Sequence, residues 1–191
     1  MNDFCVLKEG KTALAYLEEN AYLSAAHILF ETTDAETGEP LSEEAKAERR
    51  AALETVLEEL RALEDPEARA DAFLEKMTEL SEDPGKSYYP RGYTFLSGTM
   101  VPAFEEAAVS LEEYEISDIV ETDYGYHILL RLPLSADAVV EISSTTGEAR
   151  TARMLAANQE YSEKLQTLAD GMELEWLPGY EAPDLLRFVA E

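Results

Sequence analysis

Two short segments of the chain, Ala26-His27-Ile28-Leu29 and Tyr126-His127-Ile128-Leu129, share a pattern in which one histidine stands within an apolar run. Such runs, bounded by polar turns, are typical of buried strands. The chain has no further histidine. A lone histidine in an apolar strand is usually a core residue. Two in matching contexts can meet on neighbouring strands, where they favour a hydrogen-bonded relay.

Two amphipathic helices are predicted between these strands. Ser42 is a favourable N-cap, and glutamates follow it in the first turn, where the helix dipole favours anions. Asp65-Pro66 ends this helix and begins the next, with Asp65 as cap and Pro66 at the first helical position. The apolar residues repeat at intervals of three and four, and the predicted inner faces are Leu53, Val56, Leu57, Leu60 and Leu63, then Ala70, Phe73, Leu74, Met77 and Leu80.

The rest of this region alternates loops with short elements. An irregular loop is expected over residues 81–92, then a short strand over 93–95 and a helix that begins at Pro102. Residues 116–121 and 126–132 are β-rich and predict a hairpin or a bulged strand pair. The order of elements predicts a small α+β domain of about 110 residues.

Helical segments are expected on both sides of this domain. We expect a helical arm over residues 1–23, the α+β domain over 24–133, and a helical and irregular segment over 134–191. The last segment is expected to hold an extended stretch near 136–142, a helix over 152–168 that stops at Gly171, and an irregular tail.

The charge of the chain excludes several classes of partner. It has 191 residues, with 15 Lys and Arg against 41 Asp and Glu, a formal net charge of −26. Nucleic acids and anionic membranes need clustered cations, so neither is an expected partner. No apolar stretch approaches the ~20 residues of a membrane-spanning helix, and no leader segment opens the sequence. Met1 fits either a native start or a chain whose leader has been removed. The single cysteine, Cys5, excludes an internal disulfide.

The sequence contains no motif for a nucleophile, a nucleotide or a zinc-protease site. Neither histidine has a carboxylate at a ligand spacing, so we expect no metal and no cofactor. The number of acidic residues does not exclude a glycosidase-like pair of carboxylates. Most of the 41 acidic side chains, however, are expected to lie on solvated helix surfaces.

Four segments occur in an order that is specific when taken together: Ala26–Leu29, Ser81–Gly85, Gly98–Glu105 and Glu115–Ile128. From about Ala25 to Pro133 the chain resembles the parvulin family of peptidyl-prolyl cis/trans isomerases. Within that family it is most similar to the extracytoplasmic foldases and chaperones of bacteria. The resemblance implies a four-stranded antiparallel sheet in the order βα3βαβ2.

The resemblance also implies a polar network. His27 and His127 match the paired histidines at the floor of the family's site. Asp83 matches a position held by Cys or Asp, and Thr122 matches the hydroxyl residue that bonds the histidine relay. For the histidines, a purely structural role in holding the sheet together is the alternative.

The implied proline pocket consists of Phe95, Met100 and Phe104, whose alternative role is plain core packing. The family often has Gly-Asp-Leu-Gly where this chain has residues 91–94, so the apolar residue that closes the pocket is missing. Tyr93 and Tyr89 are the candidates to replace it. The loop after the first strand is acidic, whereas phosphate-directed relatives have basic residues there, so no preference for phosphorylated substrates is expected.

The resemblance implies a non-covalent prolyl isomerase that assists the folding of secreted or extracytoplasmic proteins, with unfolded or Pro-containing polypeptides as clients. The alternative is a catalytically weak holdase, and a weaker third possibility is an acidic structural domain. The flanking helices are expected either to form part of a chaperone module or to pack on the isomerase domain as arms. The module would bury Leu14, Leu17, Leu155, Leu165, Leu168 and Trp176. An incomplete module would favour a homodimer.

Overall fold

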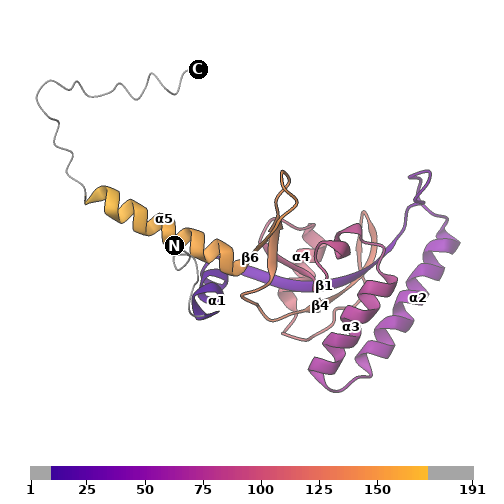
Figure 1. Ribbon diagram of the computed structural model, residues 1–191. Coiled ribbons are helices and arrows are strands. Elements are labelled where there is room, and N and C mark those ends of the chain that lie inside the picture. Colours follow the sequence, from indigo (N-terminus) through magenta and orange to yellow (C-terminus); the bar gives the residue numbers. More distant parts are fainter. Residues whose placement is uncertain (1–9, 172–191) are drawn as a thin grey trace, which may run out of the picture. The chain divides into compact units, whose positions relative to one another are not determined.

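The computed structural model describes residues 10–171. Residues up to Ala157 form one compact unit, and those from Asn158 onward belong to a second. The first unit contains a four-stranded antiparallel sheet in the order β2-β1-β4-β3, with β1 and β4 side by side at its centre (Figure 1). Its strands are β1 (Tyr22–Glu31), β2 (Tyr93–Leu96), β3 (Val120–Thr122) and β4 (Gly125–Arg131).

The helices complete the predicted α+β architecture. They are α1 (Gly10–Glu19), α2 (Glu43–Arg61), α3 (Pro66–Leu80), α4 (Pro102–Ser110) and α5 (Ala152–Asp170). The third helix expected between the first two strands is a single 3-10 turn, η1 (Pro84–Ser87). The sheet order and strand directions therefore confirm the predicted fold class.

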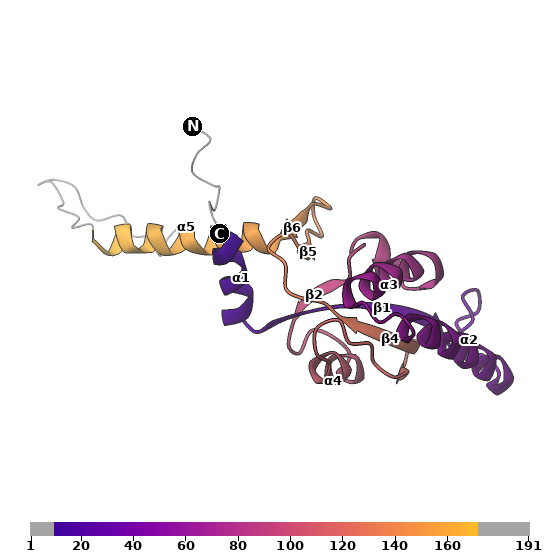
Figure 2. The same ribbon diagram turned by 90° about the horizontal axis from the view of Figure 1, so that it is seen from below.

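The sheet has a different core on each face. Figure 2 shows α3 on one side of the strands and α4 on the other. The helices α2 and α3 pack Leu53, Leu60 and Phe73 against Ile28 and Ile128. On the opposite face, α4 contributes to a smaller cluster whose buried members are Ala25, Phe95, Phe104, Ala108 and Leu129. Because successive side chains of a strand point to opposite faces, β1 and β4 supply both cores.

Both predicted N-caps are present. The Ser42 side chain accepts a hydrogen bond from the Ala45 amide at 3.2 Å, and Asp65 accepts one from Ala68 at 2.8 Å. Two predicted inner-face residues are wrong: Leu63 and Leu80 are 37 and 38 % exposed. Leu63 lies beyond the end of α2 and Leu80 is the last residue of α3, so the periodic pattern extends past the part of each helix that contacts the sheet.

Two element boundaries also differ from the prediction. The first helix ends at Glu19 rather than Leu23, and β1 begins at Tyr22 after Ala21, which has a positive φ of 55°. Pairing of β1 with β2 reaches this early part of the strand and overrides the helical spacing. The predicted strand over 116–121 is short, because Ile116 forms only an isolated bridge to Leu130.

The flanking segments meet in a third small core. Leu17 of α1, Tyr22 and Ala152 of α5 are buried together, with Leu134 and Val140 packed beside them. The predicted extended stretch is β5 (Val139–Ile142), which pairs with β6 (Ala149–Thr151), a strand that the sequence did not predict. Leu14 and Leu155 are partly buried, whereas Leu165 and Leu168 are exposed, contrary to the expected burial; Trp176 lies outside the described residues.

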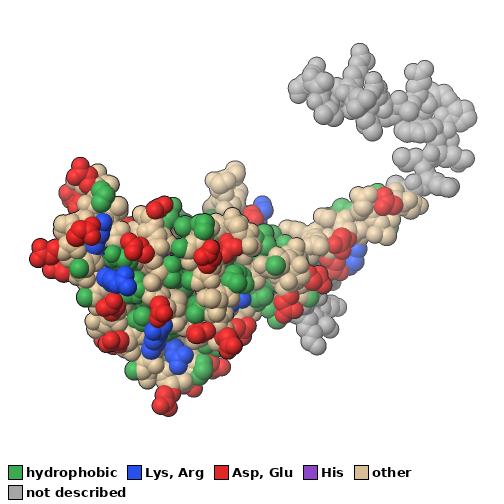
Figure 3. All heavy atoms as spheres, turned by 180° about the vertical axis from the view of Figure 1, so that it is seen from behind, with side chains coloured by type: hydrophobic (Ala, Val, Ile, Leu, Met, Phe, Trp, Pro, Cys, Tyr) green, Lys and Arg blue, Asp and Glu red, His purple; other side chains and the backbone are tan. Residues whose placement is uncertain are grey.

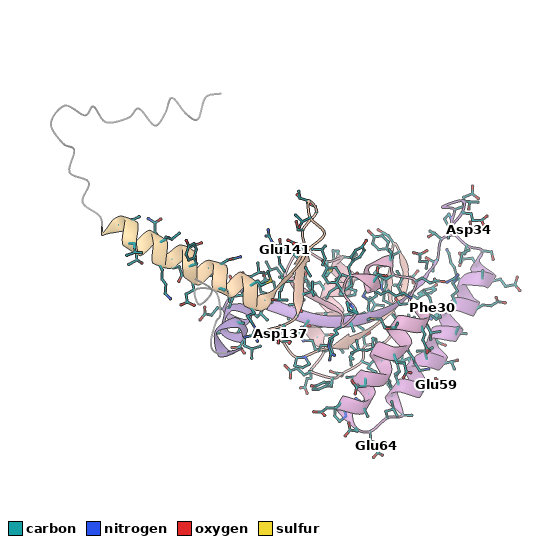
Figure 4. The ribbon with its side chains drawn as sticks, in the orientation of Figure 1. Phe30, Asp34, Glu59, Glu64, Asp137 and Glu141 are labelled. Carbon is teal, nitrogen blue, oxygen red and sulfur yellow. The ribbon has the colours of Figure 1, made fainter. Side chains whose placement is uncertain are left out.

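Acidic side chains are scattered over the face shown in Figure 3, with fewer lysines and arginines among them. Glu59 on α2 and Glu64 in the α2–α3 turn are exposed examples (Figure 4). Among residues 10–171, no helix combines the length and the apolar character needed to cross a bilayer.

Candidate functional site

The register of the two central strands brings both histidines to one place. His27 pairs with Leu129, and His127 pairs with Leu29, so the two imidazoles lie on the same face, two positions apart along the sheet. Their ring centroids are 5.3 Å apart, and their exposed fractions are 7 and 5 %. The matching apolar runs of the sequence are thus neighbouring strands, as predicted.

A tight hairpin places Thr122 on His127. Its hydroxyl is 2.8 Å from Nε2 of the His127 ring, across the turn between β3 and β4. Gly125 follows this turn with a φ of +148°, and a Cβ there would lie 2.2 Å from the Phe30 carbonyl oxygen. Only glycine therefore fits at Gly125 and lets β4 start beside the end of β1.

Asp83 reaches the histidines from the loop after α3. This loop is fixed to the end of β1, because the Leu29 amide donates to Ser81 Oγ and the Glu82 amide donates to the Leu29 carbonyl. Asp83 Oδ1 accepts from the Gly85 amide at 2.9 Å, and Oδ2 lies 3.5 Å from His27 Nε2.

Tyr93 adds a contact that sequence reasoning missed. Its phenol donates to Asp83 Oδ2 at 2.7 Å, and its ring stacks on His27 with centroids 5.6 Å apart and an angle of 17°. Tyr89 in turn lies 4.6 Å from the Tyr93 ring. The sequence marked both tyrosines as candidates to close the pocket, but gave no signal for the bond to Asp83.

The three predicted pocket residues lie in one apolar cluster next to the histidines. Phe95 and Phe104 are buried with ring centroids 5.9 Å apart, and Met100 packs against the same cluster. The Phe104 ring meets the His27 and His127 rings at nearly right angles, at 5.2 and 6.1 Å. An apolar wall and the polar network therefore share Phe104 as their boundary.

Glu105 holds the loop that carries Met100. Its carboxylate accepts from the Ser97 hydroxyl at 2.5 Å and from the Gly98 amide at 2.7 Å. These hydrogen bonds lower the pKa of Glu105, so the carboxylate is charged at neutral pH. The sequence did not mark Glu105 as a site residue, and its position directly after Phe104 was the available signal.

Burial keeps both imidazoles neutral at physiological pH. It lowers the pKa of His27, an effect that the nearby Asp83 carboxylate partly offsets. Burial, and then the neighbouring His27, lower the pKa of His127 to about 4. Nδ1 of each ring is buried without a hydrogen-bond partner. Within the described part of the chain, Thr122 is hydrogen-bonded to His127 and Asp83 Oδ2 lies 3.5 Å from His27 Nε2, whereas no hydrogen bond joins the two rings. The predicted hydrogen-bonded relay is therefore interrupted between the histidines, which are in packing contact only.

The structure thus brings all seven predicted site residues together, and it shows no group of three or more potential metal ligands within residues 10–171. A four-stranded antiparallel sheet with two buried histidines beside an apolar cluster is the arrangement expected of a parvulin-type peptidyl-prolyl isomerase. The sequence model of the PPIC-type PPIase (rotamase) domain matches residues 27–132, more than half of the chain. The chain belongs to this family.

Curated relatives agree with this assignment. The chain is 37% identical over 121 residues to the foldase protein PrsA of Halalkalibacterium halodurans, and 36% identical over 116 residues to that of Oceanobacillus iheyensis. The matches cover 61 and 60% of this chain but only 29 and 30% of those proteins. Among solved structures, PrsA from Bacillus subtilis aligns with 96% of this chain and 60% of its own, at 21% identity and a TM-score of 0.47.

Proposed function

We propose that this domain catalyses rotation about X-Pro peptide bonds in polypeptide clients, without a covalent intermediate. The X-Pro amide resists rotation by about 18–20 kcal/mol because its C–N bond has double-bond character. The twisted amide loses that resonance, so its nitrogen becomes more amine-like and its carbonyl more ketone-like. A catalyst therefore needs a grip on the proline ring and a polar surface suited to the turning carbonyl.

The apolar cluster around Phe104 supplies the grip in this proposal. Phe95 and Phe104 are buried and rigid, and Met100 can adapt to the ring of the bound proline. Because Phe104 also touches both imidazoles, a proline ring bound at this cluster has its preceding carbonyl beside the polar network.

The polar network supplies the second requirement. His27 and His127 are neutral, so they add no charge that would fix the carbonyl in one orientation. The carboxylate of Asp83 lies beside them, where a negative charge disfavours the resonance form with a negative carbonyl oxygen. The single observation that carries the proposal is the placement of Asp83, the two histidines and Phe104 around one point.

We infer that the clients are unfolded, extracytoplasmic polypeptides, because the curated relatives are foldases. The loop after β1 carries Asp34, Glu36 and Glu39, which disfavours a phosphorylated residue before proline. A net charge of −26 also suits basic clients. Matched peptides with Ser-Pro and phospho-Ser-Pro test this point: we expect the phosphorylated peptide to be the poorer substrate.

The flanking segments are proposed to belong to a chaperone module that binds the same clients. Their joint core of Leu17, Tyr22 and Ala152 supports this role, and Leu165 and Leu168 of α5 are exposed apolar residues available to a second copy. Light scattering tests the proposed homodimer: Leu165→Glu with Leu168→Glu is expected to lower the measured mass if this surface forms it.

A protease-coupled isomerisation assay on tetrapeptides with varied residues before proline tests the catalytic proposal. We expect His127→Ala and Asp83→Asn to lower kcat/KM sharply while circular dichroism shows an intact fold. Asp118→Asn is the matched control, because this carboxylate is exposed and pairs with Arg61 away from the site. A folded but inactive parent chain that still binds unfolded polypeptide would favour the holdase alternative.

A further inference from the structure

Tyr93 contacts two members of the polar network at once. Its hydroxyl donates to Oδ2 of Asp83, the same oxygen that faces His27 Nε2. The phenol is 2.7 Å from that oxygen and the imidazole nitrogen is 3.5 Å away, so the phenol is the closer partner. The Tyr93 ring meanwhile lies nearly parallel to the His27 ring.

Two glycines, Gly85 and Gly92, leave the space that the Tyr93 side chain and the backbone before it occupy. A Cβ at Gly85 would lie 1.7 Å from the Tyr93 hydroxyl oxygen, so any other residue at Gly85 would occupy the position of the phenol. Gly92 has a φ of +86°, and a Cβ there would lie 2.6 Å from the Ala25 carbonyl oxygen. The backbone just before Tyr93 therefore lies directly against β1, close to His27.

The phenol remains a hydrogen-bond donor over the working pH range. Burial, with the adjacent Asp83 carboxylate as a further cause, raises the pKa of Tyr93 well above its ordinary value. Asp83 Oδ1 is already bonded to the Gly85 amide, so both carboxylate oxygens have a defined donor.

We propose that Tyr93 is a positioning residue for the isomerase reaction: it holds the Asp83 carboxylate beside His27 without letting the two form a close ion pair. This inference rests on the proposed function of the site. Without the hydroxyl, the nearest side-chain donor for Oδ2 is Nε2 of His27, and a bond between them favours the protonated imidazole. The charged ring would then lie where the neutral one is needed.

The other groups that face His27 define the expected pH effect. They are His127 from β4, Asp83 from the loop after α3, and Tyr93 from β2, while α4 contributes the uncharged Phe104. Loss of the phenolic bond increases the effective negative charge next to His27. We expect the pKa of His27 to rise by about half to one unit in Tyr93→Phe.

The test compares Tyr93→Phe with Tyr88→Phe, a matched change at a tyrosine that is 64% exposed. Two quantities are measured across pH: kcat/KM by NMR exchange on a Pro peptide, which needs no coupling protease, and the titration of the His27 ring by NMR. The inference predicts that Tyr93→Phe lowers kcat/KM and moves both the acid limb and the His27 midpoint to higher pH. Tyr88→Phe is expected to match the parent.

An unchanged His27 midpoint in Tyr93→Phe overturns the inference, whether or not activity falls, because Tyr93 is then only a packing residue. If Tyr93→Phe does not fold, Gly85→Ala displaces the same phenol from the other side and is expected to give the same shift. If the parent chain is inactive but Tyr93→Phe still shifts the His27 midpoint, the result contradicts the proposed catalysis and supports the effect of Tyr93 on the Asp83–His27 pair. Failure of the proposed function and failure of this inference are therefore distinguishable.

Discussion

The two faces of the central sheet are built from the same strands but differ in role: one face forms the main core, and the other carries the candidate site. Toward α2 and α3, residues such as Ile28 and Ile128 enter a predominantly apolar core. Toward α4, the next residues along each strand are His27 and His127, whose Nδ1 atoms are buried without partners. Burying an unpaired polar atom lowers stability. The comparison indicates that apolar burial on the α2/α3 face stabilises the fold and offsets the cost of the unpaired polar atoms buried on the α4 face.

The largest expected effect is a loss of stability when a large side chain is removed from the core between the sheet and α2/α3. Phe73 is fully buried on α3, and Phe73→Ala should lower the free energy of unfolding by about 3–5 kcal/mol. Urea unfolding measures this loss. Phe104→Ala, on the opposite face, is the comparison: it should raise KM in the isomerase assay, whereas the folded fraction of Phe73→Ala should keep the KM of the parent. Equal KM values for both variants would contradict the division between the faces.

Acid should destabilise the domain because the buried His127, on the α4 face of the sheet, is neutral in the folded chain. The pKa of His127 is about 4 in the folded chain and about 6.5 when unfolded. Below about pH 6.5 the unfolded chain binds a proton that the folded chain does not, so stability falls as pH drops toward 4, by up to about 1.4 kcal/mol per unit. His127→Gln should reduce this slope in urea unfolding measured from about pH 7 to about pH 5. Parallel slopes in parent and variant would show that His127 is not buried in its neutral form.

A pair of hydroxyl substitutions sharpens the comparison. Thr122→Val removes the bond to His127, and Thr94→Val removes the buried 3.1 Å contact with Ser24 on the α3 side. A hydrogen bond of about 1 kcal/mol predicts about a fivefold fall in kcat/KM for Thr122→Val. Thr94→Val should lower stability by a similar amount and leave kcat/KM unchanged. If the two variants had the same activity, the Thr122 bond would be structural only.

The smallest effect is expected at Glu105. Removing its carboxylate in Glu105→Ala frees the Ser97–Gly98 turn and, with it, Met100. We expect a modest rise in KM with little change in kcat, because the loop shapes the pocket and does not touch the polar network. Glu106→Ala, one position along the same helix and exposed, is the control. A fall in kcat alone would argue against this role.

Most of the fold could be predicted because its signals are local. Ser42 and Asp65 cap helices by contacts within four residues, and the apolar runs at His27 and His127 identify the central strands. The strand over 149–151 was missed because its Ala-Arg-Thr sequence has no apolar alternation, and only its pairing with β5 makes it a strand.

The candidate site was predicted less completely, for a related reason. The seven residues carried by the resemblance do come together, but the bond from Tyr93 to Asp83 joins two segments through a space that Gly85 leaves open. Neither residue type specifies that contact on its own. Likewise Glu105 resembles any acidic helix residue until the turn at Gly98 is seen beside it.

The strand order has a consequence for how this domain forms. β1 comes first in the domain, yet it lies between β2 and β4, and its long partner β4 comes last. Contacts between distant parts of a chain form slowly, because a large loop must close before they contribute. During synthesis, the edge of β1 that pairs with β4 therefore stays unpaired until nearly the whole domain has been made. In that interval β1 presents an unpaired strand edge, the kind of exposed segment that makes partly folded chains prone to aggregation.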